Sequence, residues 1–158
     1  MSNADLSIKQ RIKSLGLQLP DVVPPVASYQ AVVEHEGVAY VSGQLPWRGG
    51  ALITGRAGEN MSLDEAREAA RLCALMVLAT LNHFLGSLDR IERVLKLNVF
   101  VNSAGDFTDQ AKVANGASEL IEQVLGPVGL HARSAVGVAI LPRGALVEVD
   151  AIVAVVAD

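Results

Sequence analysis

Apolar residues recur at helical spacing in the middle of the chain. Between positions 66 and 84 they return every three or four residues, and almost every position from Leu72 to Leu81 is apolar. Ser62 and Glu65 can form a capping box before this stretch. The pattern predicts a long helix, ending at Gly86, that is buried on more than one side.

One further helix is predicted before this one in the sequence and another after it. Residues 5–15 form a short amphipathic pattern with its own capping box. A second long helix is expected from an N-cap at Asp106 to Leu125. Gly116 inside it costs about 1 kcal/mol relative to alanine, and a close approach to another backbone would explain its presence there.

Stretches rich in β-branched and aromatic residues predict the strands. They cover residues 28–34, 38–42, 94–101, 132–140 and 146–156, with a further short strand near 51–54. This order of elements predicts an α+β fold, in which a mixed six-stranded sheet carries two helices packed on one face. We expect a single domain over 1–158, whose residues 1–27 form the first helix and a proline-rich tether.

Composition narrows the classes of partner. The chain is 51% hydrophobic but only 4% aromatic, so its core consists of small aliphatic side chains and favours association with further copies. The net charge is −4 and the cationic residues are dispersed, which argues against a nucleic-acid partner. No apolar run of about 18 residues predicts a membrane span, and no signal peptide is visible. We therefore expect a soluble cytoplasmic protein with no membrane partner.

Candidate chemistry is concentrated around one arginine. The three histidines and Cys73 lack the spacing of metal ligands, and no phosphate-binding loop occurs, so neither a metal nor a cofactor is expected. On a strand, Arg133 shares its face with Ala135 and Gly137, which leaves room beside a side chain suited to binding a carboxylate. A structural ion pair of Arg133 with Glu148 or Asp150 is an equal alternative.

Several motifs occur in the order found in the RidA (YjgF) family, whose older label is "endoribonuclease L-PSP". They are Tyr29, Val41-Ser42-Gly43-Gln44, Ala132-Arg133-Ser134, and Leu141-Pro142 followed by Val147-Glu148-Val149. The chain resembles a longer branch of this family with an extra N-terminal helix. The resemblance implies a chorismate-mutase-like fold, a homotrimer, and clefts between subunits that bind a small carboxylate ligand.

The resemblance also implies roles for individual residues. Arg133 binds a substrate carboxylate and Glu148 handles protons, so both are catalytic candidates. Tyr29, Ser42, Gly43, Ala135 and Asn115 are the further substrate-binding candidates. Ala135 stands where the family usually has cysteine, and Asn115 lies one helical turn beyond the place expected for an asparagine, where Ala111 stands.

The best-known family members are deaminases, hydrolases that convert enamines and imines such as 2-aminoacrylate to 2-keto acids and ammonia. This activity is our first hypothesis, and a non-catalytic trimer that binds small keto acids is the second. An endoribonuclease is less favoured because the chain is acidic. A tight hairpin at Arg143-Gly144 would place Arg133 and Glu148 on the same side of the sheet, about 20 Å apart, so that a shared site would need two subunits.

Overall fold

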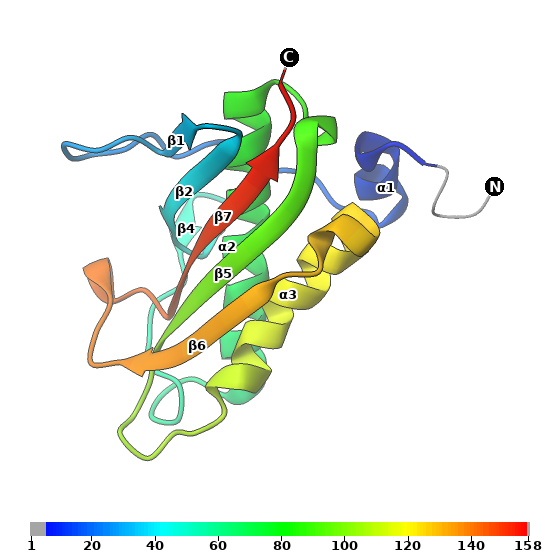
Figure 1. The fold of residues 1–158 in the computed structure, drawn as a ribbon. Coiled ribbons are helices and arrows are strands. Elements are labelled where there is room, and N and C mark those ends of the chain that lie inside the picture. The colour runs from blue at the N-terminus through cyan, green and yellow to red at the C-terminus, as the bar shows by residue number, and fades with distance from the viewer. Residues whose placement is uncertain (1–5, 158) are drawn as a thin grey trace.

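The computed structural model describes residues 6–157 and consists of a sheet covered on one face by two helices (Figure 1). The sheet has five strands in the order β1-β2-β7-β5-β6. All neighbours are antiparallel except β5 and β6, which are parallel. The strands are β1 (Val32–His35), β2 (Val38–Gln44), β5 (Ile91–Asn102), β6 (Ala132–Val138) and β7 (Val147–Val155).

The predicted α+β class is confirmed, but the main sheet has one strand fewer than the six expected. The short strand near 51–54 exists as β4 (Ala51–Leu52), and it pairs with β3 (Trp47–Arg48) in a separate two-stranded ribbon. The first strand also begins four residues later than expected, because residues 28–31 precede the pairing of β1 with β2. Glu36 and Gly37 form the tight turn between β1 and β2, with positive φ at both residues.

Helices α2 (Leu63–Leu85) and α3 (Gln110–Leu125) lie side by side on one face of the sheet, α2 against β7 and β2 and α3 against β5 and β6 (Figure 1). The capping box of α2 and its left-handed end at Gly86 are confirmed. Helix α3 begins later than expected, because Asp109 rather than Asp106 occupies the N-cap, without a side-chain capping bond. By length and composition alone α2 could cross a membrane, but 72% of its most apolar window is buried inside the domain, as in a core helix.

The expected hairpin between the last two strands is wrong. Pro142–Gly144 does form a tight turn, with Arg143 in the left-handed region, but β5 lies between β6 and β7. Leu146 and the carbonyl of Gly144 bond to Ile53 and Gly55, so the chain passes around the end of β5. Helix α3 is the crossover connection that places β6 parallel to β5 at the edge of the sheet.

The N-terminal helix α1 (Ile8–Ser14) packs against the C-terminal end of α3. Its capping box between Ser7 and Gln10 is confirmed, and the helix begins at Ile8, later than the expected residue 5, which itself lies outside the described residues. The Arg11 guanidinium donates to the carbonyl of Val124 at 3.0 Å. Residues 15–31 follow without helix or strand, and carry the chain across the domain to β1.

Candidate functional site

Arg133 lies on the edge strand β6 and directs its side chain to α3. Its Nη1 donates to Asn115 Oδ1 at 2.8 Å and to Ser118 Oγ at 3.2 Å, and its Nη2 donates to the carbonyl of Ala111 at 3.3 Å. Ala135 lies on the same face, partly buried against the core. The alternative of an ion pair with Glu148 or Asp150 is wrong, because those residues lie on the other face of the sheet.

These three contacts leave a defined part of the guanidinium free. Arginine has five N–H donors, and both hydrogens of Nη1 and one of Nη2 are directed at α3. Within residues 6–157, no protein acceptor is found for Nε. The remaining hydrogens, on Nε and Nη2, can form the parallel pair that binds a carboxylate through both of its oxygens.

Glu148 lies on β7, on the face of the sheet that the helices do not cover. Side chains alternate along this strand, so that Val147 and Val149 are buried and Glu148 is half-buried. A Cβ on Gly43 would collide with the Glu148 carboxylate, so the glycine makes room for that side chain. Burial, and then the negative charge of Asp150, raise the pKa of Glu148 above its ordinary value.

Ser42 lies on β2, the strand that pairs with β7, and Tyr29 lies in the segment before β1. The Ser42 hydroxyl donates to the carbonyl of Gln30 at 2.6 Å, and the Ser42 amide donates to the carbonyl of Ala31. These bonds hold the segment before β1 against β2, and Tyr29 is the next residue back along it, 50% exposed. One end of β2 therefore holds the segment that follows Tyr29 through Ser42 and adjoins Glu148 through Gly43, and these four residues form one group.

The structure separates the predicted site residues into two groups. Arg133 is level with Leu97 of β5, and Glu148 is level with Phe100. The two positions are therefore three residues apart along the strand direction, which is about 10 Å, and two strands apart across the sheet, which is also about 10 Å. The two side chains also point to opposite faces, which corrects the expectation that they share one. A small ligand cannot touch both groups within one chain.

Two residues on α3 complete the surroundings of Arg133. Asn115 was predicted at the site, and the structure places its side-chain oxygen against the guanidinium. Ser118 was missed, although it lies three residues further along the same helix, and this spacing puts it on the same face. Ser118 also contacts His131 Nε2 at 2.9 Å. Helical spacing from Asn115 is the signal that could have identified Ser118.

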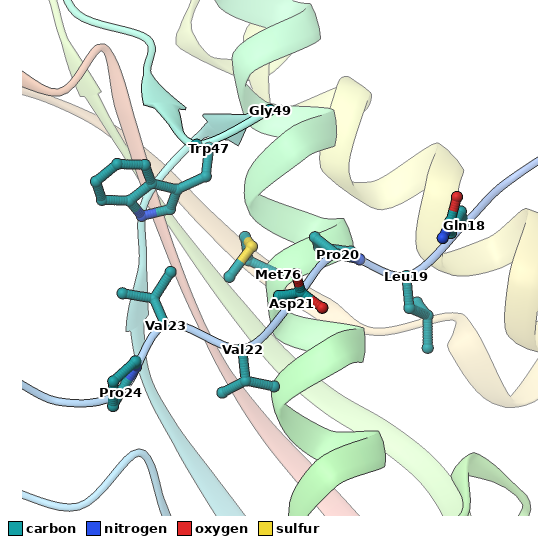
Figure 2. A pocket seen from close by; sticks show the side chains of 11 residues that line it. Gln18, Leu19, Pro20, Asp21, Val22, Val23, Pro24, Trp47, Gly49 and Met76 are labelled. Atoms are coloured by element: carbon teal, nitrogen blue, oxygen red, sulfur yellow. The ribbon is translucent and has the colours of Figure 1, made fainter.

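A cavity of about 530 Å³ lies away from both groups, where residues 18–24 cross α2 (Figure 2). Trp47 and Met76 line it together with the tether, and none of the predicted site residues does. Residues 18–24, which belong to the proline-rich tether, thus form one wall of this cavity. The candidate site in one chain is instead open, consisting of two separate surfaces.

Comparison with known proteins gives one consistent family. Residues 19–155 match the family model described as Endoribonuclease L-PSP. Protein TCP17 of Trypanosoma cruzi is 49% identical over 148 residues, which is 92% of each chain. The crystal structure of Atu1372 from Agrobacterium tumefaciens is 46% identical, with a TM-score of 0.88 over 94% of this chain and 92% of that one. A candidate endoribonuclease from Shewanella oneidensis is 26% identical, with a TM-score of 0.92 over 95% and 100%.

Proposed function

Because the chain belongs to the Endoribonuclease L-PSP family, also known as YjgF or RidA, we propose that it hydrolyses enamines and imines derived from 2-amino acids. The products are 2-keto acids and ammonia, and the enzyme is a hydrolase acting on C–N bonds. The free Nε–Nη2 edge of Arg133 is the observation that carries this proposal, since every such substrate has a carboxylate beside the reacting carbon.

The reaction requires positioning and one group that moves protons. With 2-aminoacrylate, the methylene carbon gains a proton and the nitrogen loses one, so that the enamine becomes an imine. Water then adds across the C=N bond, giving a carbinolamine whose nitrogen takes up a further proton. Ammonia leaves as the C–N bond breaks, and the hydroxyl gives up its proton as the C=O bond of pyruvate forms. Glu148 is suited to pass these protons because its raised pKa lies closer to neutrality than that of an ordinary glutamate. Orientation and one acid–base group together account for a rate factor of about 10² to 10⁴.

The site is proposed to form between subunits. Family members typically form homotrimers, and the two groups of site residues lie on opposite faces of one sheet, too far apart for one small ligand. In a trimer, the Arg133 group of one subunit would meet the Tyr29–Ser42–Gly43–Glu148 group of the next. We place the protein in the cytoplasm, where amino-acid metabolism would supply such intermediates.

Turnover of freshly generated 2-aminoacrylate tests this function. We expect the purified protein to accelerate pyruvate formation above the rate in buffer, and Arg133→Ala to abolish the acceleration. Arg48→Ala, which removes an exposed arginine from β3, outside the main sheet, serves as a matched control and should keep full activity. Equal rates with and without the wild-type protein would refute the enzymatic proposal.

Carboxylate binding without turnover is the second candidate. It is favoured by Ala135, which stands where the family usually has a cysteine, so that no thiol is available there to hold water. Calorimetry with pyruvate distinguishes the two: binding that depends on Arg133, in a protein without turnover, identifies a binding protein. RNA cleavage has less support, because the chain carries a net charge of −4; RNA binding with a steep salt dependence would be needed to favour it.

A further inference from the structure

A chain of hydrogen bonds joins Arg133 to the loop that precedes its strand. Arg133 Nη1 donates to Ser118 Oγ at 3.2 Å, Ser118 Oγ lies 2.9 Å from His131 Nε2, and His131 Nδ1 lies 2.6 Å from the carbonyl of Gly129. Ser118 belongs to α3, while His131 directly precedes β6. The chain therefore links the helix and the strand between which Arg133 is held.

The direction of each bond follows from the chemistry of the groups. A carbonyl oxygen only accepts, so His131 Nδ1 carries the hydrogen that is donated to Gly129. In the neutral ring Nε2 is then an acceptor, and the Ser118 hydroxyl donates to it. The hydroxyl oxygen keeps its lone pairs for Arg133. Each member is thus oriented by the next, and the serine hydroxyl cannot rotate away without losing its bond to the histidine.

We propose that Ser118 and His131 are positioning residues that fix which edge of Arg133 is presented to the ligand; this inference rests on the proposed function. Asn115 and Ser118 both accept from Nη1, so the two hydrogens of that nitrogen define the orientation of the guanidinium plane. With both hydrogens of Nη1 held by α3 and one hydrogen of Nη2 given to the carbonyl of Ala111, the Nε hydrogen and the second Nη2 hydrogen remain for a ligand. Without Ser118, only the bond from Nη1 to Asn115 and the longer bond from Nη2 to the Ala111 carbonyl remain, and the guanidinium plane is held less firmly.

This role explains two polar residues that the catalytic chemistry does not use. Neither Ser118 nor His131 has to touch substrate, since both act through the arginine. Their side chains are half-buried, where a helix-facing serine and a histidine would otherwise have no evident purpose. A preorganised arginine binds a carboxylate more tightly, because less side-chain freedom is lost when the ligand arrives.

Binding of pyruvate to serine variants tests the proposal. We expect Ser118→Ala to weaken binding about tenfold, the typical effect of losing one bond to a charged group, without loss of thermal stability, since alanine favours the helix. Ser118→Thr keeps the hydroxyl and should restore most of the affinity. Ser14→Ala also removes a helix serine hydroxyl, one that donates to the carbonyl of Arg11 on α1, and should have no effect. In an Arg133→Lys background, Ser118→Ala should cost much less, because the group that it orients is gone.

Nitrogen NMR of the ligand-free protein gives a second readout that does not depend on the proposed function. His131 should carry its hydrogen on Nδ1, and its Nε2 resonance should move in Ser118→Ala while those of His35 and His83 stay unchanged. Unaltered pyruvate binding by Ser118→Ala, or a hydrogen on Nε2 in the neutral ring, would overturn the positioning role. If the wild-type protein binds no 2-keto acid, the proposed function fails, and the hydrogen-bond chain is then judged on the nitrogen spectra alone.

Discussion

At the scale of single residues, the geometry of Arg133 matters more than its charge. Lysine carries the same charge but is a point donor, which cannot reproduce the parallel Nε–Nη2 pair or the contacts with Asn115 and Ser118. We expect Arg133→Lys to lose most of the affinity for pyruvate, measured by calorimetry, while the thermal unfolding midpoint changes little. Unchanged affinity in this variant would make Arg133 a structural residue.

Glu148 gives the reaction its predicted pH dependence. Because its pKa is raised, the carboxyl stays protonated to a higher pH than an ordinary glutamate, and its function as a base is lost as the pH falls through that raised value. Asp150 contributes to the shift by its negative charge. We expect Asp150→Asn to move the acidic limb of the pH–rate profile to lower pH, and Glu148→Gln to abolish activity. Glu92→Gln, at an exposed position of β5, should leave the profile unchanged, and an unmoved limb in Asp150→Asn would exclude Glu148 as the titrating base.

At the scale of elements, the contact between α2 and α3 depends on Gly116. A Cβ at this position would collide with the backbone carbonyl of Arg67 on α2, which confirms the close approach expected from a glycine inside a helix. Alanine gains about 1 kcal/mol in helix propensity, but overpacking typically costs about 1–3 kcal/mol. We expect Gly116→Ala to lower the free energy of unfolding by up to about 2 kcal/mol, the cost of overpacking less the gain in helix propensity, measured in urea. Gly105→Ala, which adds a methyl group in open space, is the control; equal stability of both variants would contradict the contact.

Local signals predicted the elements well, and pairing between distant strands was where prediction failed. Capping boxes at Ser7 and Ser62 fixed two helix starts, because each depends on side chains three residues apart. The turn at Arg143 was also recognised, yet it does not join neighbouring strands, since Leu146 pairs with Ile53 instead of continuing a hairpin. That choice depends on the insertion of β5 between β6 and β7, which no local pattern encodes. The opposite faces of Arg133 and Glu148 follow from this insertion.

At the scale of the whole molecule, the uncovered face of the sheet should be the contact between subunits. It carries apolar side chains that one chain leaves in solvent, among them Tyr40 and Val136, at 50% and 46% exposure. We expect a trimer at micromolar concentration by light scattering, with a stability that depends on concentration. Val136→Glu should weaken association, whereas Leu130→Glu, at a comparably exposed position outside the sheet, should not. A wild-type monomer would refute both the trimer and the shared site.

Mixing two inactive variants tests whether the site is shared between subunits. Arg133→Ala lacks the carboxylate anchor and Glu148→Gln lacks the proton carrier, so we expect each trimer alone to be inactive. If each cleft takes Arg133 from one subunit and Glu148 from the next, random exchange at equal concentrations gives an intact cleft whenever both contributors are the undamaged ones. That is about one half times one half, or a quarter of all clefts, in a head-to-tail ring.

We therefore expect about a quarter of the wild-type rate after the two variants are unfolded together and refolded. The same variants refolded separately and then combined should stay inactive, because their subunits have not exchanged. If Arg133 and Glu148 served a site within one chain, every subunit would carry a damaged site. Neither protocol would then recover activity. Recovery in the co-refolded sample alone is the result that only a site between subunits can produce.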